Sequence, residues 1–194
     1  MANQIYQIQI ALKECKPKIW RRLLIPSNLL LSDLHKIIQT AMGWTNTHLH
    51  QFIKNRTYYT VKMEGDDMWD EMDNVDYKKI KISDLLTKEK ERISYEYDFG
   101  DGWQHEIILE KMLPVDDTIK YPICLKGKMN CPPEDCGGVW GYENMLEILK
   151  QPKHEEYEEL VEWLGGDDFD PEHFDKEEVN ELLREKDYGC ESFF

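Results

Sequence analysis

Alternation of apolar and polar residues predicts β-strands through much of the first 113 residues. Residues 5–12 alternate, with Tyr6, Ile8 and Ile10 on one face, which is typical of a half-buried strand. A second strand is expected over residues 19–25, ended by Pro26, so that the two form a hairpin. Residues 51–61 also have strand character, with an interruption near Asn55-Arg56.

The stretch from Tyr95 to His105 predicts another hairpin. Apolar residues alternate before and after Gly100-Asp101-Gly102, and glycines in that position supply the positive φ angles of a tight turn. We therefore expect Asp98 to accept hydrogen bonds from backbone N–H groups of the turn, and Gly102 to adopt a positive φ. The outgoing strand is expected to end near Leu113-Pro114.

Helical spacing of apolar residues replaces alternation elsewhere. Residues 34–42 repeat at intervals of three and four, with Ser32 as the expected N-cap and Gly43 as the C-terminal stop. Ser83 gives a similar signal for a short helix. Further helices are predicted at 142–149, at 156–164 and after a capping Asp175.

This order predicts an α+β fold: a mixed or antiparallel sheet with a packed helix and a helical C-terminal region. We expect a single domain over residues 1–194. It divides into a sheet-plus-helix core at about 1–113, an irregular Cys/Pro/Gly loop at 114–140, and C-terminal helices at 141–187. Residues 64–76 contain seven acids and no base, so they predict a solvated loop that Met68, Trp69 and Met72 dock on the core.

Composition is that of a globular protein, with 41% hydrophobic and 11% aromatic residues. No apolar run reaches the roughly 18 residues of a membrane span, and the N-terminus lacks the features of a signal peptide. These observations predict a cytoplasmic protein without membrane association. The five cysteines are an odd number and are expected to be reduced.

The net charge of −15 is unevenly distributed. Residues 1–60 hold eight Lys or Arg and two Asp or Glu, so the remaining residues carry a balance of −21. The acidic part is expected to fold against the basic part. The alternative is a basic face that meets an anionic partner, formed by Lys13, Lys16, Lys18, Arg21 and Arg22. The first interpretation is favoured, because overall acidity repels nucleic acid.

Chemically useful residues gather around the predicted turn. Asp98, Asp101 and His105 are candidate catalytic residues, since carboxylate and imidazole groups together can transfer protons. The structural alternative is that Asp101 is a turn residue and His105 a core histidine.

Two other motifs contain metal-ligand types. His48 and His50 share one face if their segment is extended, and Cys131 and Cys136 bracket a Pro-rich loop. With His105 they form a candidate set for zinc, which prefers imidazole and thiolate ligands. The spacing of the cysteines differs from that of zinc knuckles, so inert thiols in a loop shaped by Pro and Gly remain the alternative.

The motifs also resemble one family when taken in order. They are Ile19-Trp-Arg-Arg22, Gly43-Trp44 with His48-Leu-His50-x-Phe52, Tyr97-Asp-Phe-Gly-Asp-Gly-Trp103-x-His105, Cys131-Pro-Pro-Glu-Asp-Cys-Gly-Gly138 with Gly141-Tyr142, and Trp163-Leu-Gly-Gly166 with Phe169-Asp-Pro171. Over about residues 4–185 the chain resembles the plasmid pRiA4b ORF-3-like family. The resemblance implies one α+β domain. It implies little about activity, because the family is uncharacterised.

Some members of that family are labelled resolvase-like. The present sequence contains neither a recognisable resolvase serine nor a basic helix-turn-helix, so it does not support that label. Nucleic-acid binding through Arg21 and Arg22 is therefore the least favoured function.

The leading interpretation is a binding module for a protein or a small ligand. The expected wall of its pocket is Trp44, His48, His50, Trp103 and His105, with residues 131–138 as a rim. The alternative is a metal-dependent hydrolase that uses His48, His50, Asp98, Asp101 and His105.

Overall fold

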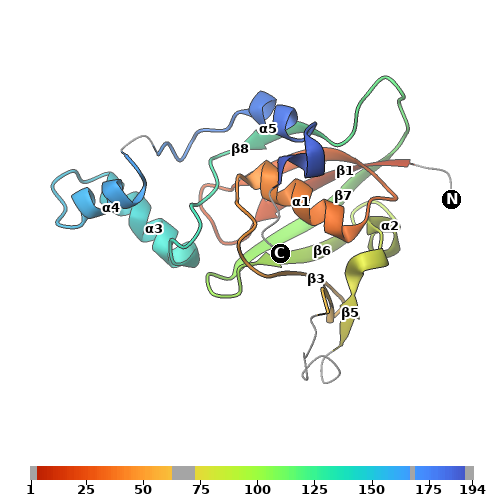
Figure 1. The fold of residues 1–194 in the computed structure, drawn as a ribbon, viewed down its shortest axis with the longest axis horizontal. Helices are drawn as coiled ribbons and strands as arrows, with labels where there is room; N and C mark the ends of the chain where they lie inside the picture. The colour runs from red at the N-terminus through yellow and green to blue at the C-terminus, as the bar shows by residue number, and fades with distance from the viewer. Residues whose placement is uncertain (1–3, 63–72, 167–168, 191–194) are drawn as a thin grey trace.

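The computed structural model describes residues 4–62, 73–166 and 169–190, and one eight-stranded sheet organises them (Figure 1). The strand order is β5-β4-β3-β6-β7-β1-β2-β8, and the neighbours are antiparallel except for β4 and β5. The strands are β1 Gln4–Leu12, β2 Trp20–Pro26, β3 His50–Lys54, β4 Thr57–Thr60, β5 Asn74–Asp76, β6 Arg92–Tyr97, β7 Trp103–Pro114 and β8 Ile123–Lys128. The predicted mixed sheet is confirmed.

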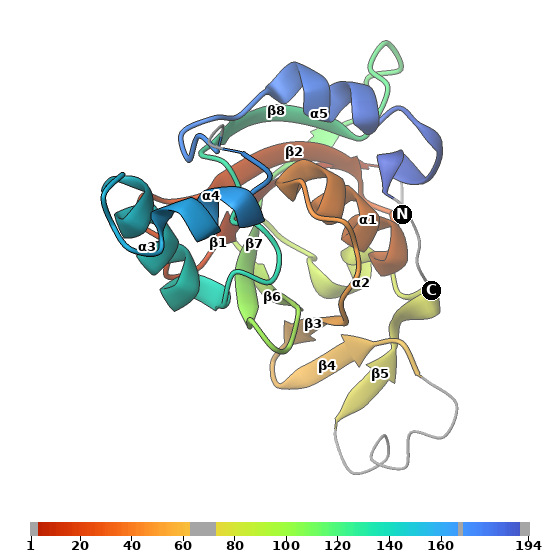
Figure 2. The same ribbon diagram turned by 60° about the vertical axis from the view of Figure 1, so that its left-hand side comes forward.

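The helices lie in two groups. One group covers a face of the sheet, with α1 across its middle and α5 beside β8, whereas α3 and α4 lie together beyond the end of the sheet (Figures 1 and 2). The helices are α1 Leu31–Met42, α2 Ile82–Leu85, α3 Gly138–Leu149, α4 Tyr157–Trp163 and α5 Lys176–Leu182, with short 3-10 turns η2 Tyr77–Lys79 and η3 Lys186–Gly189. The α+β class is confirmed. None of the helices in the described ranges is long and apolar enough to cross a membrane.

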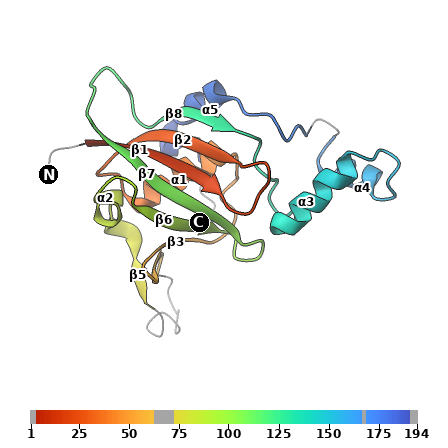
Figure 3. The same cartoon turned by 180° about the vertical axis from the view of Figure 1, so that it is seen from behind.

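Alternation along β1 separates the core from an exposed face. Tyr6, Ile8 and Ile10 are buried toward α1, as predicted. The opposite face has no described helix across it (Figure 3) and carries polar pairs. One of these pairs joins Arg22 Nε to Glu110 Oε2 at 2.7 Å. A sheet with one solvated face is the usual outcome of period-two patterning.

Both predicted features of the β6–β7 turn are present. The Oδ1 atom of Asp98 accepts hydrogen bonds from the backbone N–H groups of Gly100 (2.9 Å) and Asp101 (3.3 Å). Gly102 has a φ of +68°. The turn is therefore fixed by its own sequence.

Two helices begin one residue or more before their predicted caps. The N-cap of α1 is Leu30 rather than Ser32, because Leu30 forms a bridge with Lys81 that sets where the helix starts. Helix α2 likewise begins at Ile82, ahead of Ser83. The cap at Asp175 is confirmed, since its carboxylate accepts from the first backbone N–H groups of α5. The docking predicted for Met68, Trp69 and Met72 lies outside the described residues.

The irregular loop predicted over 114–140 is wrong in two places. Strand β8 forms within it and α3 starts at Gly138. The strand is held from both sides: β2 pairs with one edge, and Asn180 of α5 binds the other. Asn180 Oδ1 accepts from the N–H of Cys124 (2.7 Å), while its Nδ2 donates to the Cys124 carbonyl (3.0 Å). Tertiary contacts therefore create a strand that local sequence does not predict.

The predicted basic face loses its central residue. Arg21 is only 2% exposed, and it donates to the carbonyls of Ala41 (2.7 Å), Trp20 (3.0 Å) and Lys128 (3.1 Å). Its guanidinium also lies 4.1 Å from the centre of the Phe174 ring. Arg21 thus joins the end of α1 to β2 and β8, and it cannot reach a nucleic acid from this position.

A buried polar layer connects α1 to the sheet. Because the Asn46 side-chain oxygen can only accept, Nε2 of His35 donates to it (2.7 Å), and Nδ1 accepts from the Tyr95 hydroxyl (2.8 Å). The Gln39 amide donates to the same hydroxyl (3.0 Å). The ring of His50 stacks on His35, with centroids 3.4 Å apart. Burial lowers the pKa of His35 to about 4 and that of His50 well below its ordinary value.

We predict that the protein loses stability as the pH falls from about 6.5 to about 4. The folded chain keeps these imidazoles neutral, whereas the unfolded chain binds protons below about pH 6.5. Stability is therefore complete above that pH and decreases by up to about 1.4 kcal/mol per pH unit for each such histidine. Denaturant titrations at several pH values measure this slope. His35→Gln should reduce it, and His173→Gln, at an exposed histidine, should leave it unchanged. Equal slopes in both variants would contradict the prediction.

Candidate functional site

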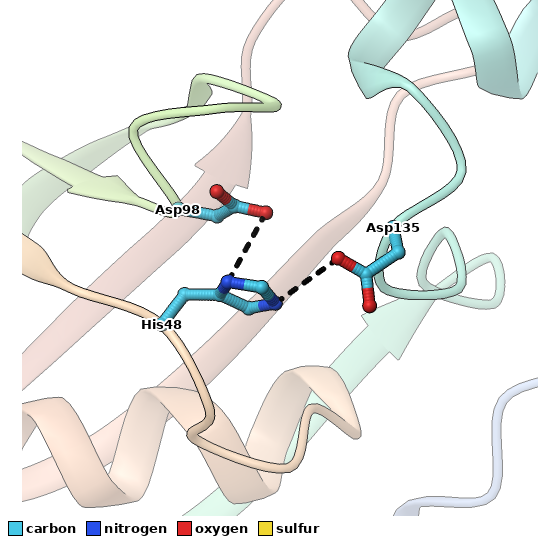
Figure 4. A group of neighbouring side chains, drawn as sticks. All are labelled: His48, Asp98 and Asp135. Carbon is cyan, nitrogen blue, oxygen red and sulfur yellow. Dashed lines mark ion pairs between the residues drawn. The ribbon is translucent and has the colours of Figure 1, made fainter.

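Three segments meet at one end of the sheet. They are the connection between α1 and β3 (residues 43–49), the β6–β7 turn (residues 98–102), and residues 131–137, called here the cysteine loop, which precede α3. Figure 4 shows one side chain from each segment, and the three converge on a common point.

The cysteine loop is fastened to the α1–β3 connection by hydrogen bonds. The indole N–H of Trp44 donates to the Pro132 carbonyl (3.0 Å), and the N–H of Thr45 donates to Glu134 Oε2 (3.0 Å). Glu134 also accepts from the Tyr97 hydroxyl at the end of β6. One glutamate therefore joins the loop to two of the other elements.

Glycines bring the same loop against the β6–β7 turn. The N–H of Gly137 donates to Asp101 Oδ2 (3.1 Å). Gly138 has a φ of +67°, and a Cβ atom built on it would lie 2.5 Å from the Asp101 carbonyl oxygen. Contact between the two backbones therefore requires glycine at this position.

His48 lies between two carboxylates as a result of this packing (Figure 4). Its Nδ1 is 3.7 Å from Asp98 Oδ2, and its Nε2 is 3.3 Å from Asp135 Oδ1. One ligand atom from each residue lies within 4.8 Å of the others. The Asp98 side chain is 10% exposed, that of His48 26% and that of Asp135 72%, so the group opens to solvent on the side of Asp135.

The electrostatics of this group favour a cation. Among the described residues, no Lys or Arg forms an ion pair with Asp98 or Asp135, and both aspartates pair only with His48. Each aspartate has a positive φ, 55° for Asp98 and 59° for Asp135. Such conformations are uncommon outside glycine and cluster at functional sites. An imidazole and two carboxylates can together bind a divalent metal ion.

Most of the predicted pocket wall lies in the core instead. Trp44 is 6% exposed, and Trp103 and His105 are fully buried, each with its ring packed against that of Trp44. His50 is held by its stacking on His35 and by the Tyr77 hydroxyl (2.6 Å). Of the predicted wall, Trp44, Trp103 and His105 are therefore buried, whereas His48 and His50 are half-buried.

The predicted zinc set is not brought together. The metal-compatible group found among the described residues contains His48 but not His50, His105, Cys131 or Cys136. His48 and His50 do not share a face, because β3 begins only at His50 and the chain bends before it. Burial raises the pKa of Cys131 and raises that of Cys136 to about 12, so both are neutral thiols in the metal-free protein.

The candidate catalytic residues also separate. Asp98 belongs to the group around His48, whereas Asp101 holds the cysteine loop. Burial lowers the pKa of His105 to about 3, and its Nδ1 faces the carbonyls of Trp103 (3.1 Å) and Tyr95 (3.3 Å).

Asp135 was missed by the sequence analysis. The one sequence feature that could have indicated Asp135 as a site residue is its position between Pro133 and Cys136 in a family motif.

A family model matches this chain over residues 4–178, and its description is plasmid pRiA4b ORF-3-like protein. The chain belongs to the plasmid pRiA4b ORF-3-like family. It is 35% identical over 171 residues to "Uncharacterized protein y4hQ" of Sinorhizobium fredii, covering 88% of this chain and 86% of that protein. It also resembles the crystal structure of "Protein of Unknown Function MM3350" of Methanosarcina mazei Go1. That match has 45% identity and a TM-score of 0.78, and covers 91% of this chain and 98% of the other.

Within this pRiA4b ORF-3-like fold, the motifs quoted above have two roles. His48, Asp98 and Asp135 form the open group at the surface. The aromatic residues of the same motifs, such as Trp44 and Trp103, form the packed layer beneath it. Short motifs that are far apart in the sequence therefore build one surface site and its support.

We predict that Gly138→Ala detaches the cysteine loop from the β6–β7 turn. The new methyl group would strain a positive φ and also collide with the Asp101 carbonyl. The cost should be roughly 1–3 kcal/mol for the backbone alone, with the collision adding to it. Gly165→Ala is the matched control, since Gly165 has a φ of +77° and nothing within 4 Å of its Cβ position. Thermal denaturation that shows equal losses in the two variants would contradict the contact.

Proposed function

We propose that this protein is a binding module whose functional centre is a divalent-cation site formed by His48, Asp98 and Asp135. The observation that carries the proposal is the convergence of these three side chains, from three separate segments, to within 4.8 Å. Convergence of this kind requires the packing of the cysteine loop against the α1–β3 connection and the β6–β7 turn.

Repulsion between the two carboxylates supports a cation in preference to an empty cluster. Two like charges this close are unfavourable unless a positive group lies between them. A divalent ion supplies that charge and also coordinates the imidazole. Mixed nitrogen and oxygen ligands suit zinc, manganese, iron or nickel, and the absence of thiolates from the group disfavours copper(I).

The geometry of Asp98 suggests how the centre is preorganised. Its Oδ1 is used by the β6–β7 turn, which leaves Oδ2 directed toward His48. Asp135 is at the exposed edge of the group. Three protein ligands would leave coordination positions on the ion for another molecule, as in metal sites that act on or bind ligands.

We predict that the protein purified without a His-tag binds one divalent ion per chain. Isothermal titration with zinc and with manganese measures affinity and stoichiometry after dialysis against chelator. Binding should raise the melting temperature, because an ion at about 100 times its Kd adds about 2.7 kcal/mol of stability. Asp135→Asn should weaken the binding at least tenfold, since it removes the negative charge of an exposed ligand and leaves its size unchanged.

Asp117→Asn is the matched control for charge, because Asp117 is an exposed aspartate in a different loop. Its ion affinity should equal that of the wild-type protein. If both variants bind as the wild type does, the ions are held loosely by surface acids and the proposed centre is wrong.

A further inference from the structure

A cavity lies next to the proposed cation site, on the side of α3 and α4. Its volume is about 230 Å³. It is lined by Asp135, Cys136, Gly141, Asn144, Met145, Ile148, Leu160 and Trp163. Asp135 belongs both to this lining and to the group around His48, so the two features are adjacent.

Most of the residues that line the cavity are apolar. Met145 and Ile148 of α3 face Leu160 and Trp163 of α4, and the polar side chains are Asp135 and Asn144. A Cβ atom on Gly141 would lie 1.8 Å from the Cys136 carbonyl oxygen, so the cysteine loop and α3 meet without intervening side chains. An apolar cavity with few polar groups at one end is typical of small-molecule sites.

We propose that the cation site and the α3–α4 cavity form a single site for a small amphipathic molecule, which has an anionic, metal-binding head and an apolar tail. The proposal rests on the proposed function, because the head is held by the ion at His48, Asp98 and Asp135. The tail enters the cavity beyond Asp135. Carboxylate and hydroxamate groups both qualify as heads, because each has an anionic oxygen that coordinates a metal ion.

Coordination to the ion determines the chemistry of the head. The ion's two positive charges are matched by Asp98 and Asp135, and an anionic oxygen then binds by coordinating the metal directly and adds only one negative charge to the site. Without an ion, the same carboxylates would attract an amine instead. The two possibilities make opposite predictions about the effect of metal.

Volume and lining determine the tail. A cavity of about 150 Å³ lined by apolar side chains is known to hold benzene, so about 230 Å³ accommodates an aromatic ring or a short alkyl chain. Burial of each methylene contributes about 0.8 kcal/mol, which is about a fourfold gain in affinity. Affinity should therefore increase with tail length until the cavity is filled.

Straight-chain hydroxamates of increasing length, from acetohydroxamate upward, test this proposal with the zinc-loaded protein. We expect the Kd to fall with each added methylene, by up to about fourfold, and binding to be lost when zinc is removed. Trp163→Ala should flatten the dependence on length because it removes one wall of the cavity. Trp140→Ala is the matched control: Trp140 is an 83% exposed tryptophan of α3 that does not line the cavity, and this variant should keep the full dependence.

The outcomes separate this inference from the function on which it rests. Zinc binding with no dependence on tail length, or equal dependence in the two tryptophan variants, would overturn the amphipathic ligand and leave the cation site intact. Failure of the wild-type protein to bind either zinc or manganese would overturn both. Alkylamines that bind the metal-free protein more tightly than hydroxamates bind the zinc-loaded protein would overturn the anionic head.

Discussion

The packing of the cysteine loop against two other segments is the constraint on which the candidate site depends. Glu134 ties the loop to Thr45 and Tyr97, while Gly137 and Gly138 bring it onto the β6–β7 turn. Asp135 lies between these attachments and so has little freedom to leave His48. A short irregular segment is fixed here because its polar groups are satisfied on both sides.

Local backbone conformation also positions the two carboxylates of the site. Asp98 and Asp135 both adopt positive φ angles, which cost free energy in residues other than glycine but are tolerated best by Asp and Asn. In Asp98 the hydrogen bonds that its Oδ1 accepts from the turn offset that cost and direct its Oδ2 outward. The β6–β7 turn therefore both imposes the positive φ of Asp98 and directs its Oδ2 toward His48. A cation between the carboxylates would relieve the repulsion between them.

Beneath the site, histidines and aromatic residues serve the fold instead of the chemistry. His35 and Tyr95 form a buried layer under α1 in which they hydrogen-bond to each other, and the half-buried His50 stacks on His35 at its edge. Such a layer specifies one arrangement of helix on sheet, because any shift would leave a buried polar atom unpaired. Sequence reasoning assigned His50, Trp103 and His105 to a ligand pocket because residue type alone does not distinguish a side chain packed inside the fold from one that faces solvent.

Elements whose causes are local could be predicted from the order of residues alone. Alternation set β1, β2, β6 and β7, and the glycines with Asp98 set the β6–β7 turn, since the necessary contacts lie within a few residues. Tertiary structure decided the rest. Strand β8 exists because β2 and Asn180 bind its two edges, and Arg21 is buried because three carbonyls from separate elements surround it. The meeting of His48, Asp98 and Asp135 is of the same kind: these residues are 50 and 37 positions apart in the chain, and only long-range packing brings them together.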